Sequence, residues 1–295
     1  METFANVREA LSKKIVIVEE QQNLARAVRY YRGNRKVLVP KLYSLSTDRV
    51  TFMEFVHGEK VAEAFDGEAR SRAKLARRLL DLLAVDVLLA ETDDALFHGD
   101  PYSGNVFHVL DDPADPFRLA LLDWGLCGSL PHSQREALMQ LFLGIFLRDP
   151  KRLRNHVGAL IEGDSWKAES EQKRVRQVVT QTLTQMKGKR AFDVLGELME
   201  NLTREGYKIR FNLGLFIKAQ ITISGILSEL DPKLKPDRYL VSQLSNQVLK
   251  EMPKRLLYTL WFPAWNSHRY RSMLSNEDVK DIQFALIARG FRKLF

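Results

Sequence analysis

Residues 97–107 read Phe97-His98-Gly99-Asp100-Pro101-Tyr102-Ser103-Gly104-Asn105-Val106-Phe107, and residues 121–125 read Leu121-Leu122-Asp123-Trp124-Gly125. The first stretch has the spacing H-x-D-x-x-x-x-N, in which the aspartate can accept the proton of an attacking hydroxyl and the asparagine can hold a divalent metal. The second ends in an x-D-x-G turn, whose carboxylate suits a metal that bridges nucleotide phosphates. We therefore predict a phosphoryl-transfer site with Asp100 as the catalytic residue and Asn105 and Asp123 as Mg²⁺ ligands.

The two motifs are joined by a predicted hairpin. Apolar runs at 106–110 and 117–122 flank a segment rich in Asp and Pro, which is typical of a turn. Such a hairpin brings the polar side chains of both motifs to one edge. H-x-D and D-x-G sequences occur singly by chance, but their joint order, offset and strand context favour the functional interpretation. We interpret His98 as a residue that braces the loop and not as a base.

The composition is that of a soluble globular protein. The chain has 295 residues, 45% hydrophobic and 28% charged, enough for one large domain or two lobes. The net charge of +8 favours contact with something anionic, such as a nucleotide or a phospholipid surface. Without a recognisable binding module, a nucleic-acid partner is not expected.

The single cysteine, Cys127, rules out an intramolecular disulfide, and a free cysteine is more often a small buried apolar residue than a redox switch. We predict neither a secretory signal nor a membrane-spanning helix. The apolar runs at 138–147 and 213–227 are too short or are interrupted by Lys218 and Gln220. A cytoplasmic location is the expectation.

The first 58 residues predict a small mixed lobe. An apolar run at 15–18 indicates a buried strand, helical spacing follows from Glu19 to Gly33, and β-branched runs at 37–39 and 50–56 indicate two further strands. Glu54 falls at the end of the last strand, where the hinge between kinase lobes presents backbone groups to adenine. We place the end of this lobe at Gly58.

After Gly58 the chain is predicted to be almost wholly helical apart from the hairpin. An amphipathic helix covers about 68–90. Further helices are predicted near 132–147, 150–162, 167–187, 191–205, 211–230, 236–260 and 276–292. The predicted fold class is α+β: a reduced N-terminal lobe (1–58) with a small antiparallel sheet and one helix, and a large, mostly helical C-terminal lobe (59–295) that carries the catalytic loop (98–105) and the metal-binding turn (123–125).

The chain resembles the UbiB or aarF-domain atypical kinases. That family carries H-A-D-P-H-P-G-N where this chain has residues 98–105, and L-D-F-G where it has residues 122–125. Residues 39–43 and 45–50 resemble the family's V-P-x-V-Y and L-S-T-x-R-V strands, and residues 53–58 resemble its M-E-[FWY]-[VI]-x-G hinge. The resemblance extends from about residue 15 to about residue 250.

This resemblance implies a protein-kinase-like fold that uses ATP and Mg²⁺, and a link to ubiquinone or other isoprenoid-quinone lipids at a membrane. By resemblance, Glu54, Phe55 and Val56 form the hinge that faces adenine. Glu20 would be the glutamate of the kinase C-helix, which pairs with a phosphate-binding lysine.

Several family features are not found. No K-x-G-Q helix, alanine-rich loop, strand lysine or E-x-D motif precedes Glu20, and Lys13 and Lys14 are weak substitutes because exposed lysines at a strand start are usually solvated. The sequence is therefore either the C-terminal portion of a longer kinase or a reduced homologue with impaired turnover.

Two alternatives stay open. A small-molecule phosphotransferase of the aminoglycoside or choline kinase kind is favoured by Gly99 and Trp124, and a nucleotide-binding pseudokinase is favoured by the missing lysine. No A-P-E-like segment follows Gly125, so the platform that holds peptide substrates in protein kinases is absent. We therefore expect a small or lipid-like acceptor, or ATP hydrolysis.

Aromatic and basic residues are mixed near the C-terminus. They are Lys254, Arg255, Trp261, Phe262, Trp265, His268, Arg269 and Arg271, with Arg289 and 291–295 at the end of the chain. Such mixtures suit an anionic bilayer interface, although the aromatic rings can equally pack the last helices together. With the family resemblance, they predict weak, salt-sensitive peripheral membrane binding.

Overall fold

The structure is a computed structural model that describes residues 17–110, 112–261 and 270–291. It has two compact units, one formed by residues 1–87, 96–129 and 218–234, and the other by residues 88–95, 130–217 and 235–295. Helices predominate, with one four-stranded and one two-stranded sheet, which confirms the predicted reduced, kinase-like α+β class. The lobes predicted at 1–58 and 59–295 are a different division from these units and stay a prediction.

A four-stranded sheet forms the centre of the first unit. Its strands lie in the order β1 (Val37–Leu38), β5 (Leu119–Leu121), β4 (Val106–Val109) and β2 (Gly58–Lys60). The predicted hairpin is present as the antiparallel pair β4 and β5, whereas β1 pairs with β5 in parallel, so the sheet is mixed. All three residues of β5 are buried. The strand that leads to the metal-binding turn is therefore held on both sides.

The helix α2 (Ile17–Tyr30) packs its apolar face into the first unit through Leu24 and Ala27. Residues 15 and 16 lie outside the described residues, and Ile17 and Val18 begin α2, so the strand predicted at 15–18 is wrong for these two residues. Two glutamates directly after them place negative charge in the first turn, which favours a helix N-terminus there.

The strand predicted at 50–56 is also wrong. In the described part of this segment, pairing is limited to an antiparallel bridge between Leu42 and Met53, with Tyr43 N–H donating to the Phe52 carbonyl at 2.8 Å. β-Branched and aromatic residues favour strands only where their side chains pack on a sheet face. Phe52 and Phe55 are instead 46% and 78% exposed.

The long helix predicted at 68–90 is present but contains a π-helical turn. It runs as α3 (Ala69–Leu80), the π turn η1 (Asp81–Val85) and α4 (Asp86–Leu88), and the Asp86 N–H reaches the Asp81 carbonyl five residues back. Gln220 of α9 (Phe211–Leu230) donates to the Leu83 carbonyl at 2.9 Å. Within the described residues, α9 is the one helix long and apolar enough to cross a membrane by length and composition, and 61% of it is buried.

Strands β3 (Asp94–His98) and β6 (Cys127–Pro131) form the two-stranded sheet. β3 leads into the predicted catalytic loop, and β6 leads away from the predicted metal-binding turn. β4 and β5 join the inner ends of the catalytic loop and the turn. β3 and β6 join their outer ends. Both functional segments are anchored by strands at each of their ends.

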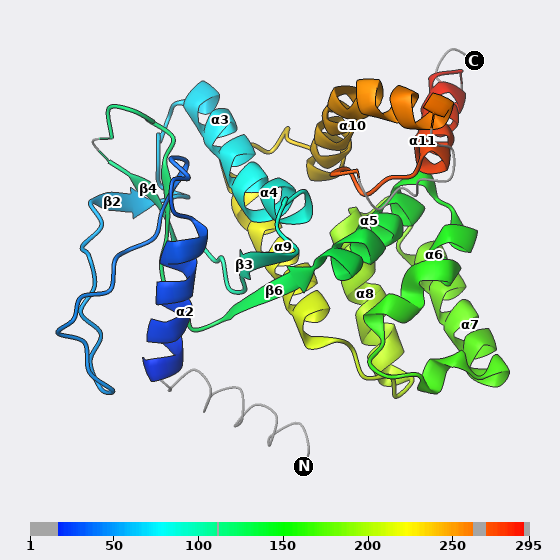
Figure 1. Cartoon of the computed structure of the whole chain (residues 1–295), viewed down its shortest axis with the longest axis horizontal. Coiled ribbons are helices and arrows are strands. Elements are labelled where there is room, and N and C mark those ends of the chain that lie inside the picture. Colours follow the sequence, from blue (N-terminus) through cyan, green and yellow to red (C-terminus); the bar gives the residue numbers. More distant parts are fainter. Residues whose placement is uncertain (1–16, 111, 262–269, 292–295) are drawn as a thin grey trace. The chain divides into compact units, whose positions relative to one another are not determined.

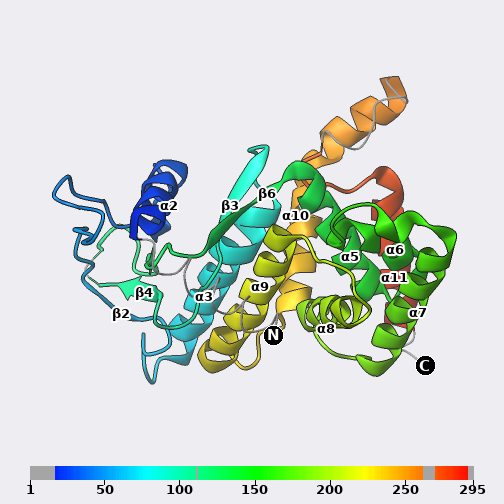
Figure 2. The ribbon, with the colours of Figure 1, turned by 90° about the horizontal axis from the view of Figure 1, so that it is seen from below.

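The second unit is helical, and its predicted helices are confirmed to within a few residues. They are α5 (His132–Leu147), α6 (Pro150–His156), α7 (Glu169–Gln185), α8 (Ala191–Arg204), α10 (Pro236–Trp261) and α11 (Asn276–Phe291). The segment predicted as one helix at 150–162 divides into α6 and the 3₁₀ turn η2 (Val157–Leu160). α5, α6, α7 and α8 lie side by side (Figures 1 and 2).

A buried ion pair holds the second half of α10. Arg255, only 3% exposed, donates to Glu251 at 2.9 Å and to the hydroxyl of Ser272 at 2.8 Å, and it stacks over the Tyr270 ring. The prediction that Arg255 belongs to a membrane-facing patch is therefore wrong. Residues 262–269 and 292–295 of that predicted patch, and the side chains of Trp261, Arg289 and Phe291, lie outside the described residues.

Candidate active site

The loop after β3 places Asp100 and Asn105 together. The side-chain amide of Asn105 donates to the Asp100 carbonyl at 3.0 Å, and the Tyr102 N–H donates to the same carbonyl at 2.9 Å. Asn105 is only 3% exposed, and its own N–H donates to the Tyr102 carbonyl. Because the Nδ2 group is used inside the loop, the amide oxygen of Asn105 is the atom left for a metal ion.

His98 connects the catalytic loop to the metal-binding turn. Its Nδ1 accepts the Asp100 N–H at 3.2 Å, so Nε2 carries the proton and donates to the Leu122 carbonyl at 2.8 Å. Burial lowers the pKa of His98, while the charges of Asp123 and Asp100 oppose that shift. The side chain is thus a neutral brace, as predicted.

The turn at Asp123 has a left-handed backbone. Asp123 has φ 55°, a conformation that Asp and Asn tolerate better than most residues, and its Oδ1 accepts the Gly125 N–H at 3.1 Å. Trp124 is 1% exposed, donates from Nε1 to the Leu121 carbonyl and packs edge-on to the His98 ring at 4.9 Å. The buried indole holds the turn so that the Asp123 side chain is exposed.

Helix α2 brings Glu20 and Asn23 to the same turn. Asn23 Nδ2 donates to the Trp124 carbonyl at 3.1 Å. The pKa of Glu20 is raised, first by burial and then by the negative charge of Asp123. Across the described part of the chain no cation pairs with Glu20, so two carboxylates share this edge of the site and favour a bound cation.

Asn23 was not predicted from the sequence. It lies three residues after Glu20, and residues with that spacing share one face of a helix. The only available signal was therefore its position relative to Glu20. The structure adds it as a residue that positions the predicted metal-binding turn.

The predicted hinge residues make their contacts with Lys41 and His57. Glu54 accepts the Lys41 N–H through Oε2 at 3.2 Å, and its N–H donates to the Lys41 carbonyl at 2.8 Å. Phe55 is 78% exposed and packs edge-on to the His57 ring, and Val56 is half-buried. A role in holding adenine stays a prediction for these three residues.

Cys127 lies just beyond the metal-binding turn and is half-buried. Burial raises the pKa of its thiol, and the charge of Arg26 only partly offsets this. A raised pKa disfavours the reactive thiolate, which agrees with the interpretation of Cys127 as a small apolar residue.

The donor set fits a metal that shares its ligands with a nucleotide. Within the described ranges, no cluster of three His, Cys, Asp or Glu side chains forms a closed metal site. One amide oxygen from Asn105 and one carboxylate from Asp123 instead suit Mg²⁺, which commonly binds one or two protein groups together with phosphate oxygens. When bound, the metal would offset charge on the transferring phosphoryl group.

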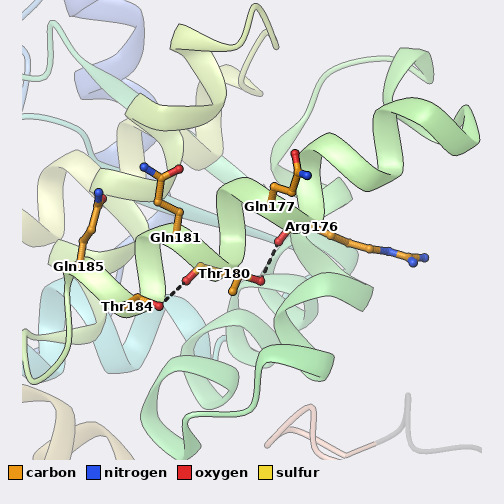
Figure 3. Close-up of a pocket in the computed structure, with 6 residues that line it drawn as sticks. All are labelled: Arg176, Gln177, Thr180, Gln181, Thr184 and Gln185. Atoms are coloured by element: carbon orange, nitrogen blue, oxygen red, sulfur yellow. Dashed lines mark hydrogen bonds between the residues drawn. The ribbon is translucent and has the colours of Figure 1, made fainter.

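A hollow on the exposed side of α7 is not part of this site (Figure 3). It is lined by residues of the second unit alone, and none carries a carboxylate: Arg176, Gln177, Thr180, Gln181, Thr184 and Gln185. All residues of the candidate active site belong to the first unit.

Comparison with known proteins finds similarity to atypical kinases. Residues 1–157 match the ABC1 atypical kinase-like domain. A probable protein kinase UbiB of Photorhabdus laumondii is 29% identical over 52% of this chain, and one of Cronobacter sakazakii is 26% identical over 79%. An aarF domain-containing protein kinase of the chloroplast of Arabidopsis thaliana is 27% identical over 77%. The chain spans only 28%, 43% and 31% of the lengths of these relatives, respectively.

Proposed function

The chain belongs to the family of ABC1 atypical kinase-like domains, which its first 157 residues match, and from that premise we propose that it binds Mg-ATP and transfers or hydrolyses the terminal phosphoryl group. In this proposal Asn105 and Asp123 hold the metal, and Asp100 accepts the proton of the attacking hydroxyl. The UbiB-type relatives support an atypical kinase over an aminoglycoside-type phosphotransferase.

The observation that carries the proposal is the convergence of charge on His98. Asp100 and Asp123, from segments on either side of the hairpin, both act on the pKa of this buried histidine. Asp123 acts in turn on Glu20 of α2. Asp100 and Asp123 therefore lie around one brace, and Glu20 lies close to Asp123, which is an arrangement that a divalent metal with bound phosphates would stabilise.

Calorimetry of Mg-ATP binding tests the metal assignment. Asp123→Asn should remove most Mg²⁺-dependent binding, because a neutral amide offsets metal charge poorly. The substitution suits the structure, since Asn also tolerates the left-handed backbone and can still accept the Gly125 N–H. Asp48→Asn, an exposed position in the same unit, is the matched control. Undiminished affinity in Asp123→Asn contradicts the assignment.

Turnover tests the role of Asp100. Asp100→Ala should lower kcat far more than nucleotide affinity, because a proton acceptor acts mainly in the transition state. A wild-type protein that binds Mg-ATP without turnover would instead support the pseudokinase alternative.

We further propose a small or lipid-like acceptor, related to isoprenoid-quinone (ubiquinone) chemistry. The chain passes from the turn at Gly125 through β6 directly into α5, which leaves no segment there to hold a peptide. The relatives bear the name UbiB, but that name supports the acceptor class only by analogy. Turnover with quinone head-group analogues compared with a peptide mixture tests this class.

Peripheral binding to an anionic membrane is part of the proposal, and the outer face of α10 supports it. Leu249, Leu256 and Leu257 are 67%, 55% and 53% exposed, and Lys250 and Lys254 are exposed beside them. Figure 2 shows the end of α10 projecting beyond α5, while Arg255 joins the helix to Asn276 at the start of α11. Apolar side chains flanked by lysines suit a bilayer with anionic lipids.

Flotation with liposomes of graded anionic lipid content tests membrane binding. Leu249→Ser/Leu256→Ser should lose association, and high salt should weaken it in the wild type. Association that ignores both salt and lipid charge contradicts this part of the proposal.

A further inference from the structure

A second polar pocket lies between α6 and α7, and cations from both helices line it. α6 contributes Lys151 and Arg154, α7 contributes Arg176, and Trp166 comes from the 3₁₀ turn η3 (Ser165–Lys167) between them. The remaining lining residues are Asn155, Gln172 and Val175. All belong to the second unit, so the pocket is separate from the candidate active site.

The lining contains no acidic residue to neutralise these three positive charges. Across the described part of the chain, none of Lys151, Arg154 and Arg176 makes an ion pair. Arg176 makes only a long hydrogen bond, 3.5 Å, to the neutral side-chain oxygen of Gln172 among the described side chains.

The acidic residues that neighbour Trp166 and Gln172 in the sequence are engaged by other groups. Asp164 pairs with Lys167 at 2.8 Å, and Glu169 pairs with Lys173 at 3.3 Å. Glu171 accepts from the Tyr207 hydroxyl at 2.6 Å. Within the described residues no carboxylate therefore balances the cations that line the pocket, and an anion is the missing complement.

The wall of the pocket includes packed side chains and not only solvated ones. The Trp166 ring is seated against Gly158, where an added β-carbon would lie 2.1 Å from Cζ2 of the indole. Val175, 2% exposed, forms the floor beside it. The guanidinium of Arg176 points away from the row formed by Thr180 and Gln185 (Figure 3). The geometry thus gives a shaped, polar pocket with two arginines and one lysine at its rim.

We propose that this pocket binds a phosphate-bearing small ligand. Guanidinium groups match phosphate oxygens through paired, charge-assisted hydrogen bonds, and the lysine adds a point charge. The side-chain amide of Asn155 supplies a further donor, whereas Nε2 of Gln172 is engaged by the Lys167 carbonyl at 2.7 Å. A multiply charged anion complements three cations better than a single carboxylate does. The ligand can be a free phosphate compound or a phospholipid head group, because both present the same chemistry.

Calorimetric titration with inorganic pyrophosphate in metal-free buffer tests the site. Without a divalent metal, the acidic residues around His98 repel the probe, so failure of the kinase proposal would not affect this measurement. Arg154→Gln/Arg176→Gln should weaken binding by about tenfold or more, because each lost pairing is a charge-assisted hydrogen bond. Lys187→Gln/Lys189→Gln removes the same charge from exposed positions outside the pocket and should leave the affinity unchanged.

Loss of affinity in the pocket variant alone supports the proposal, whereas no binding, or equal loss in both variants, overturns it. Should the double arginine variant fail to fold, Lys151→Gln, an exposed single substitution, takes its place and should weaken binding in the same direction. Flotation with phosphatidylcholine vesicles, with and without phosphatidic acid, then separates the two sources. Vesicle binding that falls in the pocket variant identifies a head group, and pyrophosphate binding alone identifies a free ligand.

Discussion

Replacing His98 with leucine should weaken the contacts that hold the candidate active site together, while Asp100, Asn105 and Asp123 are unchanged. Leucine has a similar volume but no ring nitrogen. It therefore loses the hydrogen bond to the Leu122 carbonyl, the acceptor for the Asp100 N–H and the edge-on contact with Trp124. The two parts of the site that His98 connects would no longer hold each other in position.

The expected cost follows from these three contacts. A buried backbone group left without a partner costs about 1–3 kcal/mol, and Leu122 and Asp100 are only half-buried, so the lower end applies to both. Loss of the aromatic pair adds about 1 kcal/mol. The total is about 3 kcal/mol, which lowers the melting temperature by roughly 6–12 °C for a chain of this size.

Differential scanning calorimetry measures this change, and Mg-ATP titration of the same sample reports on the site. His98→Gln, which can still donate to the Leu122 carbonyl, should lose about half as much stability. His57→Leu, an exposed histidine in the same unit, gives up only its ring contact with Phe55 and should lose no more than about 1 kcal/mol. If His98→Leu melts within about 2 °C of the wild type, His98 is not the brace that we infer.

Three further predictions concern other parts of the chain. Burial lowers the pKa of His98, so below its ordinary value of about 6.5 the unfolded chain binds a proton that the folded site refuses. Stability should fall as the pH drops from there towards the lowered pKa, and urea titrations at graded pH should show a shallower fall for His98→Gln. Gly58→Ala places a β-carbon 2.6 Å from the His108 carbonyl oxygen and should cost about 1–3 kcal/mol in urea unfolding; unchanged stability would contradict the close approach. Glu251→Gln leaves Arg255 buried without its counter-charge and should cost about 3–5 kcal/mol, whereas Glu251→Met/Arg255→Met should recover much of that stability, and equal losses would refute the argument.

The sequence predicted most where local signals agree with tertiary packing. The helix at 132–147 was predicted with the bounds that the structure gives, because it lies between Pro131 and the Asp149-Pro150 pair, where Asp149 caps the next helix. The hairpin and the bracing role of His98 followed from motif spacing. In these cases one short segment contained all the information that its structure needed.

The errors arise where structure depends on partners distant in the sequence. The apolar run at 50–56 has the composition of a strand, but Phe52 and Phe55 stay 46% and 78% exposed and are not buried on a sheet face. Asn23 was missed because its role depends on the Trp124 carbonyl, about a hundred residues away, and an isolated Asn carries no signal of its own. Likewise, the Glu251–Arg255 pair has ordinary i,i+4 helix spacing, and no local pattern could show that Ser272 and the Leu274 carbonyl complete its burial.

The π turn at Asp81–Val85 indicates where a residue can be inserted or deleted without disturbing the flanking helices. A π turn holds one residue more than an α turn, as the bond from the Asp86 N–H to the Asp81 carbonyl shows. Deleting one residue there, such as Ala84, would let the helix close as a regular α-helix while α3 and α4 keep their facing directions. The same deletion within α3 would rotate every later side chain of the helix by about 100° and turn Leu79 away from the core. Insertions and deletions among natural homologues should therefore gather at 81–85 and avoid 69–80.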